Sequence, residues 1–180
     1  NLLELFFVLF YSFLYTNKVK VPLFYNHKSD ILDCMETFFT PTAIFLATIG
    51  AFITGALWYS PLLFMKAWLK GEGVTKEHLP KRSMLYMFRI NVYSLIAHAC
   101  IATVLALVFD LVQVESLTIA MSIAALLTLG LIVSSRFIDM LYTTQGTHYD
   151  FKSQIKFLVA SGYYLAVSVV ISSILFCVAK

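Results

Sequence analysis

Four long apolar runs constrain the fold of this chain more than any other feature. A helix rising 1.5 Å per residue needs roughly 20 residues to cross a hydrocarbon core of about 30 Å, and each run approaches that length. No run alternates with period two, and backbone groups inside a bilayer must bond within their own segment, so we expect helices. The runs are Pro41 to Tyr59, Ile90 to Phe109, Leu117 to Ser135 and Phe157 to Val178. The sequence therefore predicts an all-α membrane protein with a four-transmembrane-helix bundle.

The composition points to the same class of protein. Hydrophobic residues make up 60% of the chain and charged residues 13%, and the mean hydropathy is +0.83, well outside soluble usage. A net charge of +3 is too small for a nucleic-acid footprint, so we expect no nucleic-acid partner. The cysteines show no metal-binding spacing and are interpreted as inert small hydrophobes. They are Cys34, Cys100 and Cys177.

The first 34 residues differ in composition from the rest of the chain. They contain no Ala and no Gly, and they are rich in Phe, Leu, Tyr, Asn, Lys and Ile, which AU-rich codons specify. The first methionine is Met35, and the stretch METFFTPTAIFLATIG is typical of the start of a membrane protein. We expect residues 1–34 to be translated upstream sequence and residues 35–180 to be the four-helix membrane domain. The alternative is a real extra segment whose apolar stretch, about 15 residues long, is too short to span.

The positions of Lys and Arg predict the orientation, because cationic loops are retained on the cytoplasmic side. Segments 60–89 and 136–156 carry nine of them, whereas the other side, counted from Met35, has Lys180 alone. We therefore expect both termini of 35–180 to face outward from the plasma (inner) membrane, with these two loops in the cytoplasm. The nine are Lys66, Lys70, Lys76, Lys81, Arg82, Arg89, Arg136, Lys152 and Lys156.

The first apolar run ends in Trp-Tyr-Ser-Pro, which predicts an interfacial anchor. Amphipathic rings favour the membrane boundary, and Pro61 disfavours helix at the residue before it, so the first helix should end or kink there. Residues 62–70 combine bulky apolar side chains with lysines that can reach headgroups, which predicts a short amphipathic helix at the boundary. The anchor residues are Trp58, Tyr59, Pro61, Lys66, Trp68 and Lys70.

A polar layer is predicted near the midplane. His98 is the only imidazole in any run, and an ionisable group at that depth is a functional candidate. The alternative is that a neutral His98 hydrogen-bonds a neighbouring hydroxyl or carbonyl and only holds the helices together. Two residues precede it on the same helix stripe, and each other run offers one hydroxyl at similar depth. The candidate polar interior comprises His98, Asn91, Ser94, Thr48, Thr128 and Ser168.

Three charged residues form a second candidate site near the cytoplasmic ends of the runs. Arg89 lies beside the second run, and Arg136 and Asp139 follow the third. Arg136 and Asp139 are three residues apart and can pair within one helix, or Arg89 can pair with Asp139 between helices. Ion pairing is the structural interpretation. The sharper alternative is that Arg89 and Arg136 bind a carboxylate or phosphate of a substrate.

Two sets of small residues predict where helices pack. Small residues at four-residue spacing let helix backbones approach closely, and hydroxyls on an apolar helix favour the protein interior. The packing face of the first run is Ala47, Ala51 and Gly55. The hydroxyl stripe of the last run is Ser161, Ser168 and Ser172.

The sequence contains no motif for an enzyme. GxSxG, HExxH, GxGxxG and P-loop patterns are all missing, as are the paired Gly and Pro breaks of transporter repeats. We therefore expect no enzymatic activity, no cofactor and no metal site.

The stretch GALWYSPLLFMKAWLKGEGVTKE resembles the signature of the membrane proteins of domain-of-unknown-function family 1761. The signature is a first helix ending G-x-x-W-Y-S-P-L-L-F, a K-x-W-x-K-x-x-G-type segment and a Thr-Lys-Glu turn. Met65 departs from it, since members often have Gly there. The resemblance covers about 36 to 180, includes Gly162 to Tyr164 in the last run, and implies a small four-helix membrane protein with no established activity. The matching residues are Gly55, Trp58, Tyr59, Ser60, Pro61, Leu62, Leu63, Phe64, Lys66, Trp68, Lys70, Gly73, Thr75, Lys76 and Glu77.

Three functional hypotheses follow for a protein embedded in the lipid bilayer. The first is a transport or permeation component that uses the polar layer. The second is a structural or accessory protein that packs against a partner, either a second copy or another membrane protein. The third is an integral-membrane enzyme that uses His98 or the three charged residues. A water-accessible pocket at His98 would favour the first hypothesis, and a dry core would favour the second.

Overall fold

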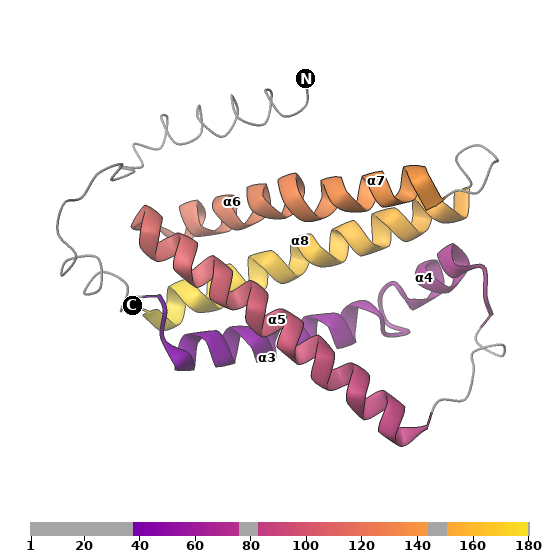
Figure 1. Cartoon of the computed structure of the whole chain (residues 1–180), viewed down its shortest axis with the longest axis horizontal. Helices are drawn as coiled ribbons and strands as arrows, with labels where there is room; N and C mark the ends of the chain where they lie inside the picture. The colour runs from indigo at the N-terminus through magenta and orange to yellow at the C-terminus, as the bar shows by residue number, and fades with distance from the viewer. Residues whose placement is uncertain (1–37, 76–82, 144–150, 180) are drawn as a thin grey trace.

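The computed structural model describes residues 38–75, 83–143 and 151–179 (Figure 1). The expectations for residues 1–34 and Met35 lie outside these ranges. So do four of the counted cationic residues, Lys76, Lys81, Arg82 and Lys180. The helices are α3 (Pro41–Trp58), α4 (Met65–Glu72), α5 (Met84–Val112), α6 (Leu117–Leu127), the π-helix η2 (Thr128–Val133), α7 (Ser134–Thr143) and α8 (Phe151–Ala179).

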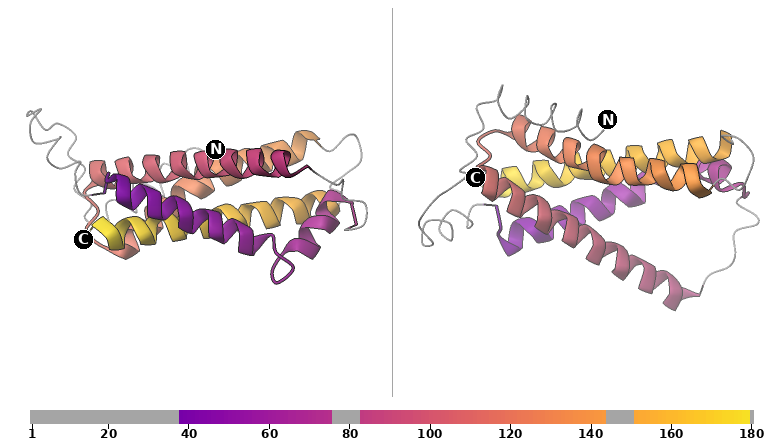
Figure 2. Two further views of the ribbon diagram at one scale, coloured as in Figure 1. Left: turned by 90° about the horizontal axis from the view of Figure 1, so that it is seen from below. Right: turned by 45° about the horizontal axis from the view of Figure 1, so that its top comes forward.

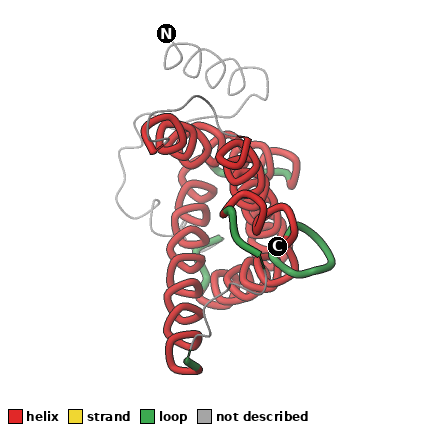
Figure 3. Tube along the Cα trace, turned by 90° about the vertical axis from the view of Figure 1, so that its right-hand side faces the viewer, coloured by secondary structure: helices red, strands yellow, loops and turns green. Residues whose placement is uncertain are grey.

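The four-transmembrane-helix bundle is confirmed. Among the described residues, four helices are long and apolar enough to cross a membrane: α3, α5, α8 and the continuous rod of α6, η2 and α7. The short amphipathic helix expected after the first span is α4. Seen end-on, the described part of the chain consists of helices and connecting loops, without strands (Figure 3).

Three spans are longer than their apolar runs: α5 and α8 extend past both ends of theirs, and the rod of α6, η2 and α7 continues beyond Ser135. Helices α5 and α8 have 29 residues each, which makes each about 43 Å long. The starts expected at Ile90 and Phe157 are therefore late, because hydropathy marks only the part of a helix that lies in hydrocarbon. Helix α5 instead begins after Ser83, whose hydroxyl accepts a hydrogen bond from the Tyr86 N–H at 3.2 Å. Such hydroxyl caps bond N–H groups that have no partner within the helix.

The third span is not a uniform α-helix. Residues 128–133 form η2, in which each turn takes an extra residue. Gly130 lies in this segment, and the Ser134 hydroxyl donates to the carbonyl oxygen of Leu129, five residues earlier, at 3.0 Å. The sequence gives no sign of this change, because a segment of six residues is too short for its hydrophobic period to distinguish a π-helix from an α-helix.

Helix α8 is the centre of the bundle. It contacts every other described helix, with α3 and α4 on one side and the α6–α7 rod on the other (Figures 1 and 2). Helix α5 crosses α3 obliquely, and its first half diverges from the other helices. The described chain starts and stops at one end of the bundle, while α4, the end of α7 and the start of α8 lie at the opposite end.

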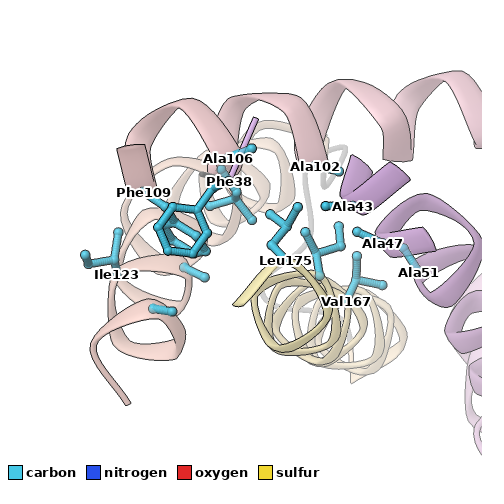
Figure 4. Packing of buried hydrophobic residues seen from close by; sticks show 14 of the residues in the cluster. Phe38, Ala43, Ala47, Ala51, Ala102, Ala106, Phe109, Ile123, Val167 and Leu175 are labelled. Atoms are coloured by element: carbon cyan, nitrogen blue, oxygen red, sulfur yellow. The ribbon is translucent and has the colours of Figure 1, made fainter. Parts of the chain in front are cut away.

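Close packing of α3 on α8 uses the predicted small residues. Ala47 and Ala51 are fully buried and point toward Val167 of α8 (Figure 4). A methyl group on Gly55 would lie 3.0 Å from the Tyr163 hydroxyl oxygen, so a larger residue there would press on that phenol. The packing face is confirmed. The hydroxyl stripe is also buried as expected, at Ser161, Ser168 and Ser172.

One charged residue has a structural role that the sequence did not indicate. Asp110 follows the end of the second apolar run at Phe109, yet it belongs to the last turn of α5 and is only 4% exposed. Its two carboxylate oxygens accept the N–H groups of Phe38 and Phe39, at 2.9 and 3.1 Å. The Phe38 ring packs edge-on against Phe109, with centroids 5.8 Å apart. Asp110 therefore fastens the segment before α3 to the end of α5.

Replacing Asp110 with Ala should destabilise the protein by about 2–3 kcal/mol, because one buried and one part-buried N–H group lose a charged acceptor. Thermal or denaturant unfolding in a fixed detergent measures the loss. Leu111→Ala is the matched control, since Leu111 is the next residue and is exposed. Equal stability of the two variants would contradict the assigned role.

Candidate functional site

His98 is buried in the middle of the bundle and has two hydrogen-bond partners. It is 5% exposed, and its Nδ1 lies 2.6 Å from the carbonyl oxygen of Ser94. Its Nε2 lies 2.7 Å from the hydroxyl oxygen of Tyr163 on α8. A carbonyl can only accept, so Nδ1 carries a proton, and a neutral ring then accepts the Tyr163 O–H at Nε2. This geometry matches the structural interpretation of His98, in which it joins two helices.

The partner Tyr163 was not identified from the sequence. In the sequence it was noted only as part of the Gly162 to Tyr164 element of the family resemblance. The hydroxyl of Tyr163 bonds His98, and its ring contacts Tyr59 and Tyr164, each with centroids 5.2 Å away. A buried phenol on an apolar helix needs a polar partner, and that requirement is the one signal that could have linked it to His98.

The other predicted members of the polar interior are placed unequally. Thr48, Thr128 and Ser168 are buried, and Ser94 is half-buried with its hydroxyl 3.4 Å from the His98 ring. The Thr48 hydroxyl donates to Ile44 and the Ser168 hydroxyl to Leu165, each within its own helix. These two hydroxyls therefore bond locally and do not extend the His98 contact into a chain.

Asn91 does not belong to this interior. It lies seven residues before His98, and its side chain is exposed. The reason is the path of α5, whose first half diverges from the bundle (Figure 2). Two residues on one helix stripe share an environment only while the helix stays parallel to its neighbours.

Trp58 and Tyr59 were expected at the membrane boundary, but both rings contact the bundle. The Trp58 indole N–H donates to the Val159 carbonyl at 3.1 Å, and its ring fills the space left by Gly162, where a methyl group would lie 3.0 Å away. Tyr59 packs against Tyr163, with ring centroids 5.2 Å apart. Both rings therefore pack on α8, and their level at the membrane boundary stays a prediction.

The turn after α3 is built as expected. The helix ends at Trp58, and Pro61 lies exposed in the turn that follows. The Ser60 hydroxyl donates to the Leu57 carbonyl at 2.7 Å and accepts the Leu62 N–H at 3.2 Å. These bonds replace those that a continued helix would have made.

Helix α4 then folds back onto α8. A methyl group on Gly71 would lie 3.0 Å from the backbone nitrogen of Lys156, so the two helices touch at this glycine. Lys66 is exposed, Trp68 is half-buried, and the Lys70 ammonium lies 4.8 Å from the centre of the Phe151 ring.

The charged residues line a pocket of about 480 Å³ between α4, α7 and α8. Arg136 and Asp139 both belong to it, as predicted, but Arg89 does not. Arg89 is exposed on the diverging half of α5. The predicted cluster of three charged residues is therefore wrong for Arg89. The pocket is lined by Gly71, Glu72, Arg136, Asp139, Met140, Ser153, Lys156, Phe157 and Ala160.

Two lining residues form an ion pair that the sequence did not predict. The Lys156 ammonium lies 2.9 and 3.1 Å from the two carboxylate oxygens of Glu72, across the contact between α8 and α4. Arg136 donates to the Tyr164 hydroxyl at 3.2 Å, and its guanidinium carbon lies 5.6 Å from the centre of that ring. Residues 84 positions apart cannot be matched by spacing alone, which is why Glu72 was missed.

A family model described as "Protein of unknown function (DUF1761)" matches residues 42–176. The chain belongs to the DUF1761 family. Comparison with curated proteins and with solved structures gave no match. The match to DUF1761 begins in the first turn of α3 and ends in the last turn of α8, so it includes all four spans, His98 and the pocket. The resemblance of the Trp-Tyr-Ser-Pro stretch is confirmed.

In this DUF1761 protein, the His98–Tyr163 hydrogen bond should contribute to stability in a measurable way. Interhelical hydrogen bonds in membranes average about 0.6 kcal/mol and reach about 1.7. A double-mutant cycle with His98→Leu and Tyr163→Phe should give a coupling within that range by unfolding in detergent.

Ser161→Ala is the matched control, because its buried hydroxyl has no hydrogen-bond partner in the described part of the chain. Its removal should leave stability unchanged or raise it slightly. Additive effects of His98→Leu and Tyr163→Phe would contradict the assigned bond.

Proposed function

We propose that this DUF1761 protein is a non-enzymatic accessory protein of the plasma (inner) membrane, and that it works by packing against a second copy of itself through the first half of α5. The observation that carries the proposal is Asn91, a polar side chain that is exposed on the diverging first half of α5. Apart from Arg89, the other exposed residues of that half are apolar. Its nearest such neighbours on the helix surface include Phe88, which is 64% exposed.

The depth of Asn91 makes its exposure costly. His98 is the middle residue of α5, and Asn91 lies seven residues away, or about 10 Å along the helix. Half of the hydrocarbon core is about 15 Å thick, and any tilt brings Asn91 closer to the midplane. An amide inside hydrocarbon without a hydrogen bond is unfavourable, so it is expected to find a partner.

A second copy of the chain supplies such a partner with the fewest assumptions. A side-chain amide both donates and accepts, so two copies of Asn91 can satisfy each other across a two-fold axis. Helix association in membranes uses interhelical polar contacts of this kind. The closed His98 contact supports an accessory role too, because its two partners already occupy both ring nitrogens.

Permeation through the polar layer is the second candidate function. The observation that favours it is the Ser161 hydroxyl, which is buried without a partner among the described residues. Such a hydroxyl is able to bond a water molecule or a solute that passes through the bundle. No contact among the described residues specifically favours the enzyme hypothesis.

The orientation is part of the proposal. The described cationic residues lie at the end of the bundle that contains α4 and the start of α8. Among them are Lys66, Lys70, Lys152 and Lys156. Asp110 and Glu115 lie at the other end. Because cationic ends are retained in the cytoplasm, we place the α4 end inside and the Asp110 end outside.

Asn91→Leu should convert the protein from dimer to monomer, because the amide pair is lost while the helix keeps its apolar surface. Single-molecule photobleaching in dilute lipid bilayers counts the copies. Ser135→Leu is the matched control, since it removes an exposed polar side chain from another helix, α7, and should leave the dimer intact. A monomeric parent protein, or a dimer that persists in Asn91→Leu, would contradict the proposal.

Labelling of single cysteines tests orientation and permeation together. In a variant without the native cysteines, a membrane-impermeant thiol reagent should label Lys66→Cys only from the cytoplasmic side and Glu115→Cys only from outside. Ser168→Cys should resist labelling from both sides, because the position is buried in a closed core. Reaction at Ser168→Cys would favour permeation over the accessory role, and reversed sidedness would overturn the orientation.

A further inference from the structure

We propose that the pocket between α4, α7 and α8 binds a zwitterionic phosphate ester, the chemistry shared by the phosphatidylethanolamine headgroup and soluble phosphoethanolamine. The inference rests on the membrane placement of the bundle, but it does not depend on dimer formation. It uses the charged, polar and apolar groups that the pocket brings together from three helices.

The charges of the pocket favour a zwitterion over a simple anion. Arg136 and Lys156 contribute two positive charges, and Glu72 and Asp139 contribute two negative ones. A lone phosphate would gain from the cations but would also face both carboxylates. A ligand with a phosphate and a neighbouring ammonium group complements both signs at once.

The donors for the phosphate come from two different helices. Two contacts of the Lys156 ammonium go to Glu72, and an ammonium has three N–H donors. The Arg136 guanidinium has five donors, one of which bonds Tyr164, and the Tyr164 contact holds the planar group in place. Ser153 adds a hydroxyl to the lining. Arginine and lysine are the side chains that most often bind phosphate in proteins.

The size and location of the pocket suit a headgroup. Its volume of about 480 Å³ lies within the range of roughly 300–1,000 Å³ found for small-molecule sites. Met140, Phe157 and Ala160 give it an apolar side, where a glycerol backbone or the start of an acyl chain would be buried. The pocket is lined by α4, α7 and α8 at the cationic end of the bundle, which the proposed orientation places beside the cytoplasmic headgroups. These features favour the lipid as the source of the ligand.

Native mass spectrometry of the full chain, released from nanodiscs of phosphatidylethanolamine and phosphatidylglycerol, tests the proposal. Retention of phosphatidylethanolamine should fall about tenfold in Lys156→Gln and in Arg136→Gln, since each removes a charge-assisted hydrogen bond. Ala160→Leu should also reduce retention, because it fills the pocket and leaves every charge in place. Lys66→Gln is the matched control, as it removes an exposed α4 lysine that is not part of the lining.

The same variants titrated with soluble phosphoethanolamine distinguish the two sources. Lipid retained by the parent protein but not displaced by the soluble compound identifies the membrane lipid as the ligand, whereas displacement at low concentration identifies the soluble ester. Both outcomes support the site. Retention that is equal in the parent and all three pocket variants, or that falls equally in Lys66→Gln, would overturn it.

Discussion

The close approach of α3 to α8 is the contact on which the rest of the structure depends. Ala47 and Ala51 bring the backbones together, and Gly55 leaves the space that the Tyr163 hydroxyl occupies. From that position Tyr163 reaches His98, so the third helix of the contact, α5, is held at its midpoint. Between helices in lipid there is little hydrophobic driving force, and close packing with a few polar bonds has to hold the bundle together.

The two ends of the bundle use charge in different ways. At one end Asp110 is buried and bonds backbone N–H groups, which fixes where α3 begins. At the other end Arg136, Lys156 and Glu72 remain accessible around a pocket, and their side chains come from three helices. A buried charge with hydrogen-bond partners stabilises a fold, whereas partly exposed charges around a pocket, even paired ones such as Lys156 and Glu72, can recognise a ligand. This contrast is why the pocket, and not the buried histidine, carries the proposed binding chemistry.

The features that the sequence revealed are those set by local patterns. Length and hydropathy found all four spans, and the spacing of Ala47 and Ala51 found the packing face, because helix geometry alone decides which residues share a side. The His98–Tyr163 bond, the inward direction of Trp58 and the exposure of Asn91 depend on how helices cross. Crossing angles follow from contacts between distant segments, which a pattern along one helix does not contain.

The most direct test of the central contact is a solid-state NMR measurement in lipid bilayers between ¹⁵N-labelled His98 and ¹³C-labelled Tyr163. A hydrogen bond of 2.7 Å between Nε2 and the tyrosine hydroxyl predicts a short-range correlation between that nitrogen and the tyrosine Cζ. The His98→Gln variant identifies the signal, since the chain has four histidines. If the parent protein gives signals from both side chains but no correlation between them, the hydrogen bond that joins α5 to α8 is contradicted.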